Sequence, residues 1–170
     1  MKKILKVALV AVCIVFAANM AKAQVKIGYI NFDQLVGLMP ETKTIRTQLE
    51  AYNKQFLDQL TAMNNDYQAK GKAYEAQRST MSDAIRTSKE AELTDIQKRM
   101  SDYQNNARQQ VENKTNELSK PLFDKARAAV TQVAKEKGYT YVINTTQTDL
   151  IVSPPGDDML NDVKAKLGLK

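Results

Sequence analysis

The feature that most restricts the fold of this chain is the stretch from Glu41 to Lys120, which contains no proline and a single glycine, Gly71. Its eighty residues are far longer than an average globular helix of about 11 residues. Pro40 precedes the stretch and Pro121 follows it. The sequence therefore predicts either one long helical rod or two helices that fold back on each other.

Apolar and aromatic residues recur every three or four residues in both halves of this stretch, as on one face of a helix. Between the two series, residues 76–90 lose this period and gather serine, threonine and aspartate. The matching lengths favour an antiparallel hairpin with its tip near 76–90 over a rod, and Thr87 with Glu90 predicts a capping box for the second helix. The first series is Ile45, Leu49, Tyr52, Phe56, Leu60, Met63, Tyr67 and Tyr74, and the second is Leu93, Ile96, Met100, Tyr103, Ala107, Val111, Leu118, Leu122, Ala126, Val130 and Val133.

The flanking segments are typical of short strands and helices. Residues 25–30 predict a strand, and residues 31–39 predict a helix capped by Asn31 or Asp33. Gly138 is placed to end the returning helix as a C-terminal cap residue. Beyond it, residues 139–145 and 149–153 predict two strands joined by a polar turn. After Pro154 a last helix is expected, capped by one of two aspartates and carrying three apolar residues on one face: Asp157 or Asp158, and Leu160, Val163 and Leu167.

Residues 1–23 have the pattern of a cleaved signal peptide. Lys2 and Lys3 form a basic start, an apolar run reaches Met20, and the Ala21-Lys22-Ala23 triplet is a small-x-small cleavage site. The run is interrupted by a lysine and is short for a transmembrane helix. We expect a soluble, exported chain that is cleaved after Ala23.

The composition argues against several classes of function. The chain has no histidine, and its one cysteine, Cys13, lies in the predicted signal, so the usual zinc ligands and nucleophile–base pairs are missing. No glycine-rich phosphate loop is present. We therefore expect no enzyme activity, metal, cofactor or nucleotide. Removing the four signal lysines from 25 basic residues leaves 21 against 19 acidic ones, a charge of +2, which argues against nucleic-acid binding.

Two groups of acidic residues have an alternative reading as weak cation sites. At helical spacing a solvated charged face is the better interpretation of the first group, and helix capping is the better interpretation of the second, whose spacing fits no calcium loop. The groups are Glu90, Glu92 and Asp95, and Asp157, Asp158 and Asp162.

The segments outside the arm favour an oligomer. Residues 24–40 and 121–170 form a body too small for a large core, and its short strands have open edges that invite pairing with other chains. A closed barrel built from several copies removes those edges. The predicted fold is α+β and mostly α: a long antiparallel, coiled-coil-like hairpin arm over 41–120, projecting from a small β-barrel body formed by oligomerisation.

The arm offers two candidate binding surfaces. Methionine and tyrosine adapt to varied partners, although a stripe of them at helical spacing also suits the seam between two helices. The tip has more cations than anions and suits anionic clients or transient contact with a membrane surface, or is simply a solvated tip. The stripe residues are Tyr52, Met63, Tyr67, Tyr74, Met81, Met100 and Tyr103, and the tip cations are Lys70, Lys72, Arg78, Arg86 and Lys89.

Several segments together resemble the Skp/OmpH family of periplasmic chaperones. They are the opening "KIGYINFDQLVGLMPE", the long breaker-free hairpin, the strand "KGYTYVIN" and the closing "DDMLNDVKAKLGL". The resemblance implies a periplasmic homotrimer whose three arms enclose unfolded outer-membrane proteins without ATP and prevent their aggregation before membrane insertion. By position it assigns the body and its trimer contacts to Val25, Ile27, Tyr29, Tyr141, Ile143 and Ile151. The competing reading is an exported scaffold whose coiled coil binds one folded envelope partner.

Overall fold

The structure is a computed structural model that describes residues 25–169, so the predicted signal peptide and its cleavage site lie outside the described residues. The chain divides into two compact units. One, here called the body, contains residues 25–37 and 126–169 of the described chain, and the other, here called the arm, contains residues 38–125. Each is described by itself.

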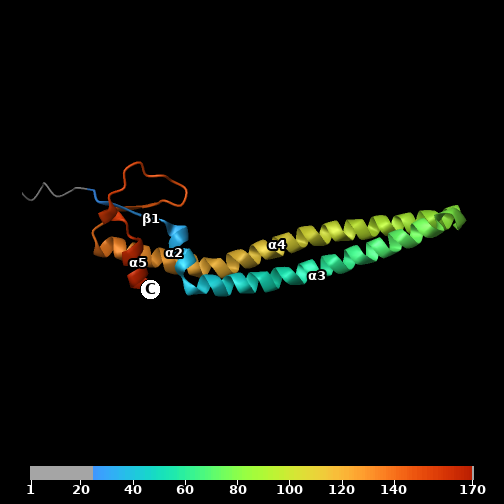
Figure 1. Ribbon diagram of the computed structural model, residues 1–170, viewed down its shortest axis with the longest axis horizontal. Helices are drawn as coiled ribbons and strands as arrows, with labels where there is room; N and C mark the ends of the chain where they lie inside the picture. Colours follow the sequence, from blue (N-terminus) through green and yellow to red (C-terminus); the bar gives the residue numbers. More distant parts are fainter. Residues whose placement is uncertain (1–24, 170) are drawn as a thin grey trace, which may run out of the picture. The chain divides into compact units, whose positions relative to one another are not determined.

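The arm is an antiparallel helical hairpin, as the sequence predicts. Helix α3 (Pro40–Gln77, 38 residues) is followed by the 3-10 turn η1 (Arg78–Thr80) and then by α4 (Asp83–Glu136, 54 residues), which reaches into the body. In Figure 1, α3 and the first part of α4 run side by side to a common tip. Every residue of both apolar series is buried or half-buried, so the 3.6-residue period marks the contact face of the helices. The alternative prediction of a single helical rod is wrong, because the stretch forms two helices.

The predicted start of the second helix is wrong. α4 begins at Asp83, and Thr87 and Glu90 are already inside it. Ser82 caps this end instead, because its Oγ accepts a 3.4 Å hydrogen bond from the Ile85 N–H and its carbonyl accepts one of 2.9 Å from the Arg86 N–H. Ser82 follows the turn directly, where the first orphan N–H groups need acceptors.

Pro121 lies inside α4 and does not end it, although proline in a helix interior costs about 3 kcal/mol. The apolar stripe of the helix continues past it through Leu122 and Ala126, which are 7% and 0% exposed. We infer that burial of this stripe offsets the missing backbone donor. The helix then closes as predicted, with Gly138 in the left-handed region at φ 73°.

The body contains a two-stranded parallel sheet of β1 (Ile27–Ile30) and β2 (Tyr141–Asn144), with Ile27 opposite Tyr141 and Ile30 opposite Asn144. Helix α2 (Phe32–Leu38) starts after Asn31, whose Oδ1 accepts a 2.9 Å hydrogen bond from the Gln34 N–H as the predicted cap. The 3-10 turn η2 (Pro155–Asp157) and α5 (Leu160–Leu167) follow β2. The largest fully buried side chains of the body are Ile30, Leu35, Met159 and Val163.

The expected second strand of a C-terminal hairpin is absent. Residues 149–153 take no strand conformation, and Ile151 and Val152 are 101% and 81% exposed. β2 pairs with β1 across the length of the chain rather than with the segment that follows it. A strand needs a hydrogen-bonded neighbour, and within residues 25–169 no strand pairs with this segment.

Candidate functional site

The tyrosines of α3 form hydrogen bonds across the seam of the arm. The Tyr52 hydroxyl donates to Gln110 Oε1 at 3.3 Å, and the Tyr67 hydroxyl accepts from Gln97 Nε2 at 2.7 Å. Nearer the tip, the Tyr74 hydroxyl donates to Glu90, which together with burial raises the pKa of Tyr74. Each tyrosine therefore places its ring between the helices and its polar end on an α4 side chain.

Six of the seven predicted client-contact residues belong to the apolar series of α3 and α4 that form this seam, and Met81 lies in the turn between η1 and α4. Tyr52 packs edge-on against Phe56 with ring centroids 5.1 Å apart, and Phe56 in turn lies 6.1 Å from the Tyr103 ring. Tyr74 is 6% exposed, whereas the others are half-buried. The seam position is thus the structural role of the six helical residues, and the role of all seven toward clients stays a prediction. The half-buried set is Tyr52, Met63, Tyr67, Met81, Met100 and Tyr103.

Sequence reasoning missed an apolar groove in the half of the arm near Pro40. Ile45 and Leu49 of α3 and Val111 of α4 line an open hollow of about 420 Å³, with Arg46 and Glu50 of opposite charge also in its lining. The signal was visible in the spacing of the second apolar series. That series skips from Val111 to Leu118, so no large apolar side chain of α4 closes the seam there.

The tip brings the predicted cations together but largely neutralises them. Lys70 and Lys89 both pair with Glu92, the latter at 3.0 Å, and Arg86 pairs with Asp83. Hydrogen bonds from these two lysines lower the pKa of Glu92 to about 2. The predicted excess of cations at the tip did not take Glu92 into account, which is close to both lysines in space.

The remaining two tip cations differ in their surroundings. Arg78 lies over the Tyr74 ring, with its guanidinium carbon 6.0 Å from the ring centroid. Lys72 has no ion pair or hydrogen bond among the residues that the structure describes. Lys72 is therefore the tip cation with the most available charge.

The acidic residues of the two groups make contacts within the chain. Asp95 pairs with Arg99 at 2.9 Å, Asp158 accepts the Leu160 N–H at 2.9 Å, and Asp157 accepts the Tyr139 hydroxyl at 3.1 Å. Asp162 pairs with Lys137. In residues 25–169 no group of three or more histidine, cysteine, aspartate or glutamate side chains is arranged to hold a metal ion. Nor does this part of the chain contain a helix long and apolar enough to cross a membrane.

Four of the six predicted body residues lie on the outer face of the sheet. The strand register places Ile27 opposite Tyr141 and Tyr29 opposite Ile143, and side chains alternate between faces, so all four point to one side. Ile27 and Tyr141 are 47% and 62% exposed, whereas Tyr29 and Ile143 are half-buried. Val25 and Ile151 are also exposed. An exposed apolar cluster of this kind marks an interaction surface.

A paired hairpin with an apolar groove, attached to a small body with an exposed apolar face, defines a helical binding protein. The family model of OmpH-like outer membrane proteins matches residues 26–167, and the chain belongs to this family. It is 29% identical over 152 residues to the chaperone protein Skp of Yersinia enterocolitica, covering 86% of this chain and 88% of that protein. The predicted resemblance is confirmed.

A solved structure has the same fold. The crystal structure of an OmpH-like protein of Caulobacter crescentus CB15 superposes with a TM-score of 0.66 at 17% identity, covering 86% of each chain. The mostly helical fold with long arms and a small strand pair is therefore confirmed as the family fold. The family to which this chain belongs is a family of chaperones and not of enzymes.

Proposed function

We propose that this protein is a periplasmic, ATP-independent holdase that binds unfolded outer-membrane proteins and keeps them from aggregating before membrane insertion. The observation that carries the proposal is the half-open seam of the arm, where apolar side chains remain partly accessible along its length and Ile45, Leu49 and Val111 line a groove. The similarity to a protein named as a chaperone supports the same reading.

The groove suits an extended, partly apolar polypeptide. Strands of outer-membrane barrels alternate apolar and polar residues, so one face of such a segment is apolar and the other is polar. Apolar residues of the client would lie on Leu49 and Val111, while Arg46 and Glu50 allow charges of either sign beside them. Because the two charges are opposite, the groove does not select clients of one charge, which fits a protein that binds many different clients.

Weak contacts of this kind need several arms to hold a client. Linked binding surfaces raise the effective concentration of each further contact, so three arms of modest affinity give useful avidity. We propose a homotrimer in which residues 24–40 and 121–170 form a shared barrel and residues 41–120 the arm. The exposed apolar side chains of Ile27, Tyr141 and Ile151 support this assembly, since apolar area of that kind is buried in oligomers.

The test combines native mass spectrometry with an aggregation assay. The chain from Gln24 is measured alone and after dilution of an unfolded outer-membrane barrel into its solution, and turbidity is followed with several unrelated barrels. We expect a trimer that binds one copy of the unfolded barrel in the mass spectrum. In the turbidity assay we expect it to suppress the aggregation of every barrel tested. Binding of a single folded envelope protein without effect on unfolded barrels would instead support the scaffold reading.

A matched pair of variants locates the contact. Leu49→Gln places an amide in the groove, whereas Leu57→Gln changes a side chain that is 54% exposed on α3 and does not line it. We expect Leu49→Gln to weaken client binding several-fold more than Leu57→Gln, with helix content by circular dichroism unchanged in both. Equal loss in the two variants would remove the groove from the mechanism.

A further inference from the structure

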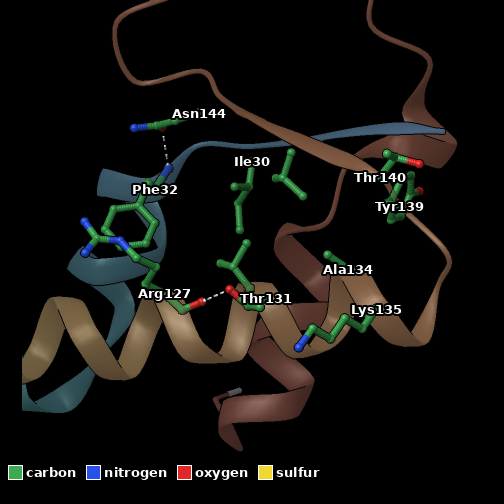
Figure 2. A pocket seen from close by; sticks show the side chains of 11 residues that line it. Ile30, Phe32, Arg127, Thr131, Ala134, Lys135, Tyr139, Thr140 and Asn144 are labelled. Atoms are coloured by element: carbon green, nitrogen blue, oxygen red, sulfur yellow. Dashed lines mark hydrogen bonds between the residues drawn. The ribbon is translucent and has the colours of Figure 1, made fainter. Parts of the chain in front are cut away.

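The tip of the arm contains a hollow of about 140 Å³ between α3, α4 and the turn that joins them. Tyr74 on α3 and Leu93 on α4 are part of its lining, and Met81 contributes to the lining from the turn. Neither the hollow of about 540 Å³ in the body, which Figure 2 shows, nor the groove beside Leu49 has a methionine in its lining. The tip hollow differs from both because a thioether forms part of its wall.

Met81 differs from the other methionines of the described chain in being both accessible and outside a helix. Met39 and Met159 are 2% and 0% exposed, so their sulfur atoms are shielded from solvent. Met63 and Met100 are half-buried within α3 and α4. Met81 is half-buried as well, but it follows η1 in an extended backbone conformation, with φ −78° and ψ 143°. A small oxidant in solution therefore reaches Met81 most readily.

Oxidation makes the thioether polar. When hydrogen peroxide reacts, the sulfur lone pair forms a bond to one peroxide oxygen and the O–O bond breaks. The transferred hydroxyl gives its proton to the departing hydroxide, which leaves as water, so the sulfur loses two electrons and the peroxide gains them. The product is a sulfoxide, whose oxygen needs a hydrogen-bond donor when it is buried.

The buried donors around the hollow are already engaged. Lys70 and Lys89 line it, and both bind Glu92. Tyr74 is 6% exposed, and its hydroxyl is hydrogen-bonded across the seam. A sulfoxide oxygen inside the hollow would therefore stay without a donor or take a lysine from Glu92. Either outcome weakens the packing of the tip, because an unpaired buried oxygen and a broken ion pair both destabilise the closed turn.

The remaining side-chain donor of the lining is Gln77, which is exposed to solvent. A sulfoxide that binds its amide lies at the mouth of the hollow rather than inside it. Hydration by solvent has the same effect, since water is also found outside the apolar wall. Each way of satisfying the new oxygen thus moves Met81 or a lysine from the position that closes the tip.

We propose that Met81 is an oxidation site for peroxides and that its oxidation opens the tip of the arm. With the thioether, the Met81 side chain fills part of the hollow and the turn stays closed over Tyr74 and Leu93. With the sulfoxide, the turn separates from these two side chains and makes them accessible. A methionine sulfoxide reductase reverses the change, since two thiols supply the electrons and the oxygen leaves as water. The inference concerns the tip alone and does not depend on the proposed function.

Peroxide treatment of the folded chain from Gln24 tests the site. This chain has no cysteine, because Cys13 is the only one in the sequence, so methionine is its only sulfur-containing residue. Peptide mass spectrometry follows sulfoxide formation at each methionine over time. We expect Met81 to be oxidised several-fold faster than Met63 or Met100. Equal rates at these three positions would overturn Met81 as the preferred site.

Hydrogen exchange measures the consequence for the tip. After oxidation we expect the amides of residues 74–93 to exchange several-fold faster, while those of β1 and β2 keep their rates. Met81→Leu retains an apolar side chain of similar volume and should abolish this response. Met100→Leu, the matched control on α4, should retain it, and treatment with reductases for both sulfoxide epimers should restore slow exchange.

Two results would reject the opening of the tip. One is unchanged exchange of residues 74–93 in a chain whose Met81 is fully oxidised. The other is an equal rise in exchange in Met81→Leu, which would assign the response to another methionine. Neither result concerns client binding, so the proposed chaperone would stand in both cases.

Discussion

The hydroxyl of Tyr67 on α3 accepts a 2.7 Å hydrogen bond from Nε2 of Gln97 on α4. Seven residues further along α3, Tyr74 donates to Glu90, which precedes Gln97 on α4 by the same seven residues. The register between the two antiparallel helices is therefore constant from the Tyr67–Gln97 pair to the Tyr74–Glu90 pair. Tyrosine hydroxyls mark the register of a seam whose half-buried apolar contacts specify it only loosely.

Replacing Tyr67 with phenylalanine removes one of these marks. We expect a loss of about 0.5–1 kcal/mol in the free energy of unfolding, because the hydrogen bond is partly exposed and replaces one to water. Chemical denaturation of Tyr67→Phe, Gln97→Ala and the double variant measures the coupling between them. Tyr103→Phe is the control, since no hydrogen bond of its hydroxyl is present among the described residues. Additive losses in the double variant would contradict a direct contact.

Glu92 makes the stability of the tip depend on pH. Its pKa in the folded chain is about 2, against 4.5 for the free side chain, because Lys70 and Lys89 bind the carboxylate. A lowered pKa means that the interaction is fully present above about pH 4.5 and is lost as the pH falls toward 2. Glu92→Gln should therefore lower the thermal midpoint at pH 7, and the difference from the parent chain should shrink between pH 4.5 and pH 3. Glu75→Gln, which removes an unpaired tip carboxylate, should show no such convergence.

Replacing either of two glycines with alanine should change the stability of the protein in opposite directions. A Cβ on Gly28 would lie 2.8 Å from Met159 Sδ and 3.1 Å from Tyr139 Cδ1, and Met159 is completely buried. We expect Gly28→Ala to destabilise the body by about 1–3 kcal/mol, as overpacking does. Gly37 in α2 has nothing within 4 Å of its Cβ position, so Gly37→Ala should raise stability by up to about 1 kcal/mol. Calorimetry of both variants decides, and equal effects would contradict the packing around Gly28.

The tip cations should separate into structural and electrostatic groups. Lys72→Gln removes a charge without an ion pair, so it should slow association with vesicles containing anionic lipid or with an acidic unfolded client at low salt, at unchanged thermal stability. Lys70→Gln removes one of the two ion pairs of Glu92 and should lower the stability of the tip as well. Stopped-flow association rates and thermal midpoints provide the two readouts. Unchanged rates for Lys72→Gln at low salt would remove the tip from client or membrane capture.

Local signals were sufficient to predict the arm. The helical period identifies its contact face from Ile45 to Tyr74 because side chains three and four residues apart meet the same neighbour. The start of α4 was mispredicted because a threonine–glutamate pair fits a capping box anywhere in a sequence, whereas only Ser82 follows the turn. The basic character of the tip was overestimated because Lys70 and Lys89 pair with Glu92, a contact that the sequence alone does not show.

The body was harder to predict because its contacts are not local. β2 reads as half of a hairpin with residues 149–153, yet it pairs in parallel with β1, more than a hundred residues away. No pattern within either strand identifies its partner. The groove beside Leu49 and the hollow of the body that Ala134 lines form where no side chain of the facing element fills the space. A sequence shows such a gap only when it is known which residues face each other.

The pairing of β1 with β2 also sets the order in which the chain is able to fold. The Phe32 N–H donates to Asn144 across 112 residues of sequence, whereas the tip contacts close within a few tens of residues. Contacts between distant residues form slowly because the intervening chain must first be brought together. We therefore expect the helical hairpin to form first, which brings β1 and β2 close to each other. The sheet then closes last, because β2 lies near the end of the chain, so the arm is formed before the apolar outer face of the sheet is.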